Sequence, residues 1–293
     1  PGKGWQDIEF SELEVGPKIG GGGFAIVHRG EWKGQTVALK TMFDPKVDDK
    51  SKAEYMNELH CMRELDHPNI VKFLGACVKP PKLCIVMELC ELSMFTAIHD
   101  RKIKFTDEQL VSMAGDVASA MAYLHSRRPI VVHRDLKSHN LLLKAKPRRE
   151  GGGYTVKLCD FGLVGNKITT AGTPNYMAPE LLRDKPFGKS SDVYAFGMCV
   201  WEMFTRQIPF DGWTPFHIRD AVLEGERPPL PSRYDCLPVI REIVQQCWSD
   251  DPADRPSFAE LERRLRSWKP AGPSAVDLVD KGGGDALDAL LGM

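Results

Sequence analysis

Three polar residues in the middle of the chain have the types and the spacing that phosphoryl transfer needs. Asp135 lies five residues before Asn140 in the run His-Arg-Asp-Leu-Lys-Ser-His-Asn, and Asp160 follows twenty residues later. One carboxylate can accept a hydroxyl proton, while the amide and the second carboxylate offer the oxygen ligands that Mg²⁺ prefers. The spacing therefore predicts a site that moves a phosphoryl group from ATP.

A run of glycines near the start of the chain and a lysine after it are candidates for holding the phosphates. Glycine lets backbone amides come close to a phosphate, where a Cβ would collide. Lys40 ends the apolar run Val-Ala-Leu-Lys and offers a positive charge. Taken alone, the glycine run is typical of a tight hairpin, and the lysine of a solvated charge. The residues singled out in the run are Ile19, Gly20, Gly22, Gly23 and Val27.

The segments around Lys40 predict strands and one helix. Short apolar runs at residues 37–40 and 83–87 are typical of strands. Between them, apolar residues recur at helical spacing from Tyr55 to Leu65, which predicts an amphipathic helix over residues 50–65. We therefore expect Lys40 on a strand with a helix nearby.

The pattern becomes helical after residue 91. Thr106 and Gln109 form a capping box that opens a helix, and further helices are expected over residues 191–204, 238–248 and 257–268. The helix that opens at Thr106 should bury one stripe of its surface. That stripe consists of Leu110, Ala114, Val117, Met121 and Leu124.

Composition and charge argue against several classes of protein. The apolar fraction of 42% is enough for a sizeable core, and the net charge of −1 gives no bulk attraction to nucleic acid or to a membrane surface. The most apolar stretch, residues 193–204, is too short to span a bilayer and contains Glu202. The eight cysteines show no metal-ligand spacing, which favours free thiols and a reducing, cytoplasmic location. The chain begins with Pro1 and not with Met, which indicates a fragment.

The order of these motifs resembles the signature of one family. The triplet Asp-Phe-Gly at residues 160–162 is followed by Ala-Pro-Glu at residues 178–180. The sequence is identified as a member of the eukaryotic-type protein kinase family, serine/threonine type. The run Leu-Lys-Ser-His-Asn and residues 247–258 resemble the tyrosine-kinase-like group, which includes Raf-like and mixed-lineage-like kinases.

The resemblance implies an α+β, bilobal protein kinase fold over residues 10–268. Residues 10–88 would form a small β-rich N-lobe with one regulatory helix, and residues 89–268 a larger helical C-lobe. Residues 269–293 are expected to form a flexible tail, with a short docking helix as the alternative. The insertion at residues 145–153 is expected at an exposed hairpin tip.

The resemblance also assigns catalytic and metal-binding roles. Asp135 would be the catalytic base, and Lys137 would neutralise charge on the γ-phosphate. Asn140 and Asp160 would hold Mg²⁺. Asp192 would anchor an apolar stack that marks the active state, made of Met62, Phe73, His133 and Phe161.

Lys40 would contact the α- and β-phosphates of ATP and needs a carboxylate to hold it in place. Glu58 matches the family pattern on the predicted helix, while Glu54 and Glu64 compete for this role. The family's third glycine in the phosphate loop is replaced by Ala25, so we expect a stiffer loop.

The adenine would lie between apolar residues of both lobes and would be read by the backbone of the hinge. The hinge continues into Glu91-Leu92-Ser93-Met94 without the usual glycine pair and one residue short, which leaves Ser93 as the candidate for the ribose hydroxyls. The residues implied for the adenine pocket are Val27, Ala38 and Leu142 on its walls, Met87 as gatekeeper, and Glu88 and Cys90 in the hinge.

The substrates implied are proteins with Ser or Thr acceptors, because Lys137 and Thr173 match the serine/threonine type. Arg134, beside the base, suggests a switch in which a phosphate on Thr169 or Thr170 orders the activation segment. The activator would be an upstream kinase or another copy of the same chain. Both threonines are otherwise interpreted as ordinary polar loop residues.

Two alternatives stay open. A pseudokinase of the same fold would bind partners without turnover. Such proteins usually lack one of five functional groups, and all five are present here: Lys40, Glu58, Asp135, Asn140 and Asp160. A small-molecule kinase of related fold would lack the peptide-docking surface that residues 160–180 imply.

Arg255 is expected to pair with Glu180 as a structural link and not a catalytic one.

Overall fold

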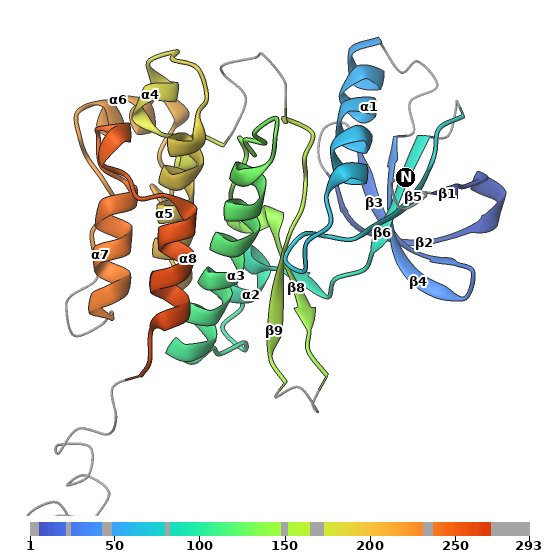
Figure 1. The fold of residues 1–293 in the computed structure, drawn as a ribbon, viewed down its shortest axis with the longest axis horizontal. Helices are drawn as coiled ribbons and strands as arrows, with labels where there is room; N and C mark the ends of the chain where they lie inside the picture. Colours follow the sequence, from blue (N-terminus) through green and yellow to red (C-terminus); the bar gives the residue numbers. More distant parts are fainter. Residues whose placement is uncertain are drawn as a thin grey trace, which may run out of the picture.

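The computed structural model describes residues 6–21, 25–42, 49–79, 83–147, 152–164, 173–230 and 237–270. These residues form two parts that lie side by side, a sheet with one long helix and a larger group of helices (Figure 1). The expected α+β, bilobal fold is confirmed. Within the described ranges, no helix combines the length and the apolar character needed to cross a membrane.

The small lobe is a six-stranded sheet with the order β1-β5-β6-β4-β3-β2. Lys40 lies on β4, between Val27 on β3 and Ile85 on β6, as the predicted strands require. The predicted helix is α1, which covers Asp49–Glu64. The strands are β1 (Gln6–Asp7), β2 (Leu13–Gly21), β3 (Ile26–Trp32), β4 (Gln35–Met42), β5 (Phe73–Cys77) and β6 (Leu83–Glu88), with a short 3₁₀ turn, η1 (Phe10–Glu12).

The two faces of this sheet bury different apolar clusters, because successive residues of a strand point to opposite faces. On β5, Ala76 joins the main core together with Tyr55 of α1. Its neighbour Cys77 instead joins a smaller cluster on the other face. We call this smaller group the outer cluster; its buried members are Ile8, Leu13, Trp32, Val37, Leu39, Cys77, Cys84 and Val86.

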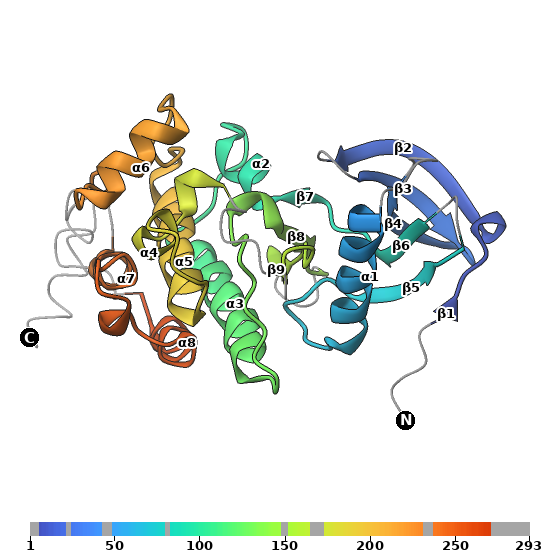
Figure 2. The same cartoon turned by 90° about the horizontal axis from the view of Figure 1, so that it is seen from above.

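The large lobe is mainly helical, with a three-stranded sheet next to the small lobe (Figure 2). Helix α5 is buried along most of its length, which explains the apolar stretch at residues 193–204. The helices are α2 (Met94–His99), α3 (Asp107–Ser126), α4 (Pro179–Leu182), α5 (Lys189–Thr205), α6 (Pro215–Leu223), α7 (Pro238–Cys247) and α8 (Phe258–Ser267). The strands are β7 (Leu92–Ser93), β8 (Leu141–Ala145) and β9 (Tyr154–Leu158), and the 3₁₀ turns are η2 (Ser138–Asn140), η4 (Pro174–Tyr176) and η5 (Pro252–Asp254).

Local sequence signals account for several of these elements. The Thr106 hydroxyl accepts the Gln109 backbone N–H, and the Gln109 side chain accepts the Thr106 N–H, so the capping box that opens α3 is confirmed. All five residues of the predicted α3 stripe are buried. β8 and β9 pair from Leu141↔Leu158 to Ala145↔Tyr154, so residues 145–153 do connect a hairpin.

A buried ion pair links α4 to the residues before α8. Arg255 donates from Nη1 and Nη2 to the two carboxylate oxygens of Glu180, at 2.7 and 2.9 Å. The pairing expected from the sequence is therefore present. Burial raises the pKa of the Glu180 carboxyl, but hydrogen bonding and charge from Arg255 lower it by more, so its net pKa is lowered.

We expect Arg255→Met to lower the free energy of unfolding by about 3–5 kcal/mol at neutral pH, because the Glu180 carboxylate would remain buried without an opposite charge, although the Ser191 hydroxyl would still donate to it. The folded-state pKa of Glu180 lies below its unfolded value. The ion pair therefore stabilises the folded state at pH values above the unfolded pKa of about 4.3. This stabilisation is lost as the pH falls through the folded-state pKa. Denaturant unfolding of both proteins along a pH series measures the difference, which should shrink in acid.

The matched control is Arg264→Met, which removes a guanidinium that pairs with the exposed carboxylate of Glu242. Exposed pairs contribute about 0–1 kcal/mol, so this variant should stay close to the parent. Equal losses in the two variants would show that burial of the Arg255 pair does not matter.

Candidate active site

The segment before η2 is held by a buried carboxylate of α5. Asp192 accepts the backbone N–H of His133 and that of Arg134, each at 2.9 Å. Arg134 has a φ of 74°, a value uncommon for a residue with a side chain, and this turn sends the next residue into the cleft. The ring of His133 lies edge-on to Phe161 at 5.4 Å, so two members of the expected stack are in contact and Asp192 binds the backbone of one of them.

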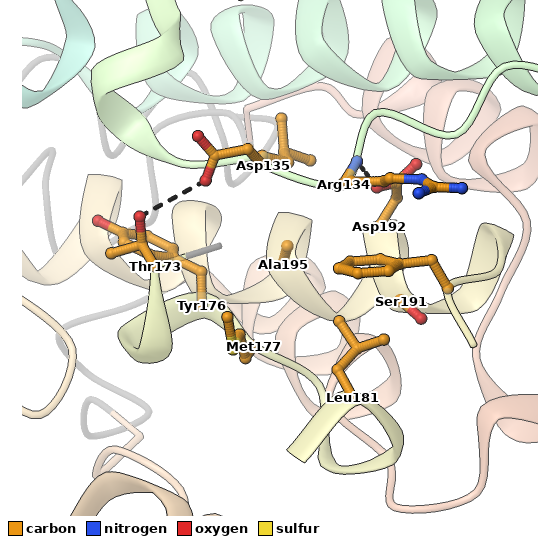
Figure 3. Close-up of a pocket in the computed structure, with 11 residues that line it drawn as sticks. Arg134, Asp135, Thr173, Tyr176, Met177, Leu181, Ser191, Asp192 and Ala195 are labelled. Carbon is orange, nitrogen blue, oxygen red and sulfur yellow. Dashed lines mark hydrogen bonds between the residues drawn. The ribbon is translucent and has the colours of Figure 1, made fainter. Parts of the chain in front are cut away.

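Asp135 is surrounded by hydrogen-bond donors. Lys137 Nζ lies 2.7 Å from Oδ2, and Asn140 Nδ2 donates to the same oxygen at 3.1 Å and to the Asp135 carbonyl at 2.8 Å. The Thr173 hydroxyl lies 3.5 Å from Oδ1 and accepts a hydrogen bond from Lys137 at 3.0 Å. Figure 3 shows the Thr173 hydroxyl facing the Asp135 carboxylate. These contacts fix the orientation of a carboxylate whose side chain is 12% exposed.

Lys40 joins the two lobes through carboxylates. Its ammonium donates to both oxygens of Glu58, at 2.6 and 2.8 Å, and to Asp160 Oδ1 at 3.2 Å. Among the competitors, Glu64 pairs with Arg63, and the side chain of Glu54 lies outside the described residues. The structure thus brings Lys40 together with Glu58 and Asp160.

The charges of this group reinforce one another. Burial lowers the pKa of the Lys40 ammonium, but the carboxylates of Glu58 and Asp160 raise it by more, so the net pKa is raised. Burial likewise raises the pKa of the Asp160 carboxyl, but Lys40, together with His133 and Lys137, lowers it by more, so that net pKa is lowered. Lys40 is therefore a cation and Asp160 an anion at neutral pH.

The residues expected to hold Mg²⁺ lie next to each other. The backbone N–H of Cys159 donates to the Asn140 carbonyl at 3.0 Å, which places Asp160 beside Asn140. The Asn140 amide nitrogen is used by Asp135, so its oxygen faces away from that residue. An ionised carboxylate and an amide oxygen fit Mg²⁺, which is usually bound through one or two protein oxygens together with substrate phosphates.

The residues expected to form the walls of the adenine pocket lie on strands of both lobes. Ala38 on β4 pairs with Met87 on β6, and Val27 on β3 pairs with Lys40. Leu142 lies on β8 in the large lobe, half-buried opposite Ser93 of β7. Of the expected phosphate loop, Ile19 and Gly20 lie near the end of β2, whereas Gly22 and Gly23 lie outside the described residues.

A family model described as protein tyrosine and serine/threonine kinase matches residues 13–265. The chain belongs to the protein kinase family. The match covers both lobes and every described residue of the site discussed above.

Curated relatives place this kinase domain within the family. It is 41% identical over 271 residues to the serine/threonine-protein kinase CTR1 of Arabidopsis thaliana, a match that covers 89% of this chain and 32% of the relative. It is 35% identical over 284 residues to the probable serine/threonine-protein kinase drkA of Dictyostelium discoideum, covering 94% and 43%. The dual specificity protein kinase shkC of the same organism is 38% identical over 268 residues, covering 87% and 50%.

The chain spans about a third to a half of the length of these relatives. The resemblance to CTR1 agrees with the Raf-like, tyrosine-kinase-like group expected from the sequence.

The hinge of this kinase domain is fastened to β8 at alternate residues. Lys144 donates to the Leu89 carbonyl, and the Glu91 N–H donates to the Leu143 carbonyl at 3.0 Å. These two bonds hold the backbone on either side of Cys90, the residue expected to contact the adenine. The Glu88 carboxylate pairs with Lys157 at 2.8 Å, and the Glu88 backbone N–H donates to the Lys72 carbonyl at 3.0 Å. The Ser93 hydroxyl caps α2 by accepting the Thr96 N–H at 3.1 Å.

A buried network of hydrogen bonds, which was not predicted from the sequence, lies beneath the segment that bears Asp135. Glu202 of α5 is fully buried, and it accepts the Tyr176 hydroxyl at 2.7 Å. His99 Nε2 lies 2.9 Å from its other oxygen, and the Tyr176 hydroxyl lies 3.2 Å from Ser138 Oγ. Burial is the largest effect on the Glu202 carboxyl and raises its pKa. The available signal was a glutamate inside the apolar stretch at residues 193–204 of α5.

Proposed function

We propose that this chain is an ATP-dependent protein serine/threonine kinase domain, formed by residues 10–268 and followed by a tail at 269–293. The observation that carries the proposal is the set of contacts around Asp135. Lys137 and Thr173 both contact its carboxylate, while Lys40 joins Glu58 to Asp160. The proposed location is the cytoplasm, where protein thiols stay reduced.

The proposed role of Asp135 is to accept the proton of the substrate hydroxyl and to align that hydroxyl with the γ-phosphorus. Phosphoryl transfer asks mainly for positioning and for stabilisation of charge. Lys137 would neutralise charge at the γ-phosphate, and Lys40, held by Glu58, would orient the α- and β-phosphates. Asn140 and Asp160 would hold Mg²⁺, which neutralises phosphate charge when it is bound.

The support for an aliphatic hydroxyl as acceptor is the position of Thr173. The Thr173 side chain contacts both Asp135 and Lys137, so it leaves less room beside the Asp135 carboxylate for the side chain of the acceptor residue. A small hollow next to the base is lined in part by Met177, Leu181 and Ala195 (Figure 3). Its volume of about 20 Å³ has room for a water molecule and not for a peptide side chain. The support for protein substrates over small molecules is the similarity to curated protein kinases.

The test is transfer of labelled γ-phosphate from Mg-ATP to a generic basic protein, followed by phosphoamino-acid analysis. Label on Ser and Thr supports the proposal, and label on Tyr as well would indicate dual specificity. A chain that shows no turnover, even after another kinase has phosphorylated its activation segment, would instead be a pseudokinase that acts through partners.

We also propose that phosphorylation of the activation segment switches the domain on. The guanidinium of Arg134 lies 5.2 Å from the ring of Phe187, and its buried Nε has no hydrogen-bond partner among the described residues. A phosphate placed there would supply both the partner and the opposite charge. The proposed phosphosites, Thr169 and Thr170, lie outside the described residues. The donor would be an upstream kinase or a second copy of the chain.

The double variant Thr169→Ala/Thr170→Ala should lose most of the activity, because Arg134 would keep its unpartnered nitrogen. Initial rates of Mg-ATP-dependent transfer measure the loss, and mass spectrometry shows whether the parent chain is phosphorylated at these positions. Full activity in the double variant would remove the switch from the proposal.

A further inference from the structure

Two cysteines of the small lobe lie directly opposite each other on neighbouring strands. Cys77 ends β5 and Cys84 lies near the start of β6, and they form the last pair before the loop that joins these antiparallel strands. Opposite residues in an antiparallel pair have Cα atoms about 4.5–5.5 Å apart and side chains on the same face. A disulfide needs a Cα separation of about 4.4–6.8 Å, so the register already meets this requirement.

The register places the two side chains opposite each other on one face of the sheet. Their mutual interaction is the largest influence on both thiols, and it lowers the pKa of Cys77 and raises that of Cys84. Both side chains lie in the outer cluster, with exposed fractions of 3% and 0%. Lys79 lies two residues after Cys77 and is exposed, so the buried pair is close to the surface of the small lobe. A local opening of the strand ends would admit a small oxidant.

We propose that Cys77 and Cys84 form a reversible disulfide when the protein meets a peroxide. The Cys77 thiolate attacks one peroxide oxygen, the O–O bond breaks, and hydroxide leaves, which gives a sulfenic acid on Cys77. The Cys84 sulfur then attacks the sulfenic sulfur, the S–O bond breaks, and hydroxide leaves again. The two thiol protons and the two hydroxides give two waters, so both sulfurs are oxidised and the peroxide is reduced.

The disulfide would act on the active site through Tyr55 of α1. The Tyr55 hydroxyl donates to the Cys77 carbonyl at 2.9 Å. Opposite Cβ atoms are about 4.5–5.5 Å apart, whereas a disulfide holds them at about 3.8 Å, so the bond would draw the strand ends together by roughly 1 Å. Glu58 follows Tyr55 by one helical turn and holds Lys40. A shift of this size at a catalytic group is enough to lower the rate.

Formation of the disulfide does not depend on the proposed function, whereas its effect on activity depends on the proposed role of Glu58. Two separate measurements therefore test the two steps. The first treats the 293-residue chain with hydrogen peroxide, blocks the remaining thiols with N-ethylmaleimide, and digests it with trypsin without reduction. Cleavage after Lys82 separates the two cysteines, so a linked peptide pair 2 Da lighter than the sum is expected. Fragment ions must assign the bond to Cys84 and not to Cys90, which lies on the same peptide.

The second measurement compares kinase activity before oxidation, after oxidation, and after dithiothreitol. The parent chain should lose activity at least threefold and recover it on reduction. Cys84→Ala and Cys77→Ala should lose far less at the same peroxide dose, while Cys247→Ala, which removes a buried thiol of α7, should behave like the parent. No linked peptide in the parent would overturn the site itself. A linked peptide with equal, reversible losses in parent and Cys84→Ala would overturn its connection to α1.

Discussion

Asp135→Asn should reduce phosphoryl transfer by about 10²–10⁴-fold while leaving the fold intact, because an amide cannot serve as a general base. The substitution fits the contacts of the site. The amide oxygen can take the place of Oδ2, which accepts from Lys137 and Asn140. The amide nitrogen can take the place of Oδ1 and donate to Thr173. Steady-state rates with Mg-ATP and a protein acceptor measure the loss.

The matched control for this variant is Asp184→Asn. Asp184 is exposed and has a φ of 57°, a conformation that asparagine tolerates well, so its activity should equal that of the parent. The thermal midpoint of Asp135→Asn should stay close to that of the parent. Turnover within tenfold of the parent, in a folded Asp135→Asn protein, would contradict the role of Asp135 as the base.

Lys40→Met should lower kcat/KM by about 10²–10³-fold, the loss that follows removal of one preorganised electrostatic contact. The apolar stem is kept, so the change is mainly the loss of a cation that the structure holds between Glu58 and Asp160. Those two carboxylates would then lie close together without compensation. Kinetics with varied ATP concentration would show whether the loss lies in KM, in kcat, or in both.

Two further variants define what Lys40 does. Lys40→Arg should not restore activity, because a planar guanidinium differs from a compact ammonium in both shape and reach. Lys72→Met removes an exposed lysine whose interactions with Glu88 go through its backbone, so it should stay near the parent. Substantial activity in Lys40→Arg would mean that charge alone, and not the geometry of the Glu58 contact, is what the site requires.

The sequence predicted those features that depend on local pattern or on the order of motifs. Thr106 and Gln109 are three residues apart, so the cap of α3 could be inferred without any tertiary contact. Lys40, Asp135 and Asp160 are far apart in the chain, yet their order and spacing were enough to group them through a family resemblance. The structure adds the distances that make this group a site.

Contacts without a local pattern could not be predicted. His99 and Glu202 are 103 residues apart, and their pairing depends on how α2 packs beside α5. The pairing of Cys77 with Cys84 depends on the register of β5 and β6, which a bulge between Phe73 and Gly75 shifts. Likewise, the bond from Lys144 to the Leu89 carbonyl follows from the position of β8 beneath the hinge.

The two backbone bonds to Asp192 have a consequence for how the site comes apart. They make the segment that bears Asp135 part of the same cooperative unit as α5, so it would be released only when the large-lobe core opens. Glu58 lies on α1, which packs on the small-lobe sheet through Tyr55, so we expect it to belong to a different unit. The site would therefore come apart in two steps, with Glu58 separating before the segment that bears Asp135. Regulation that acts on the position of Glu58 would need much less free energy than unfolding the whole domain.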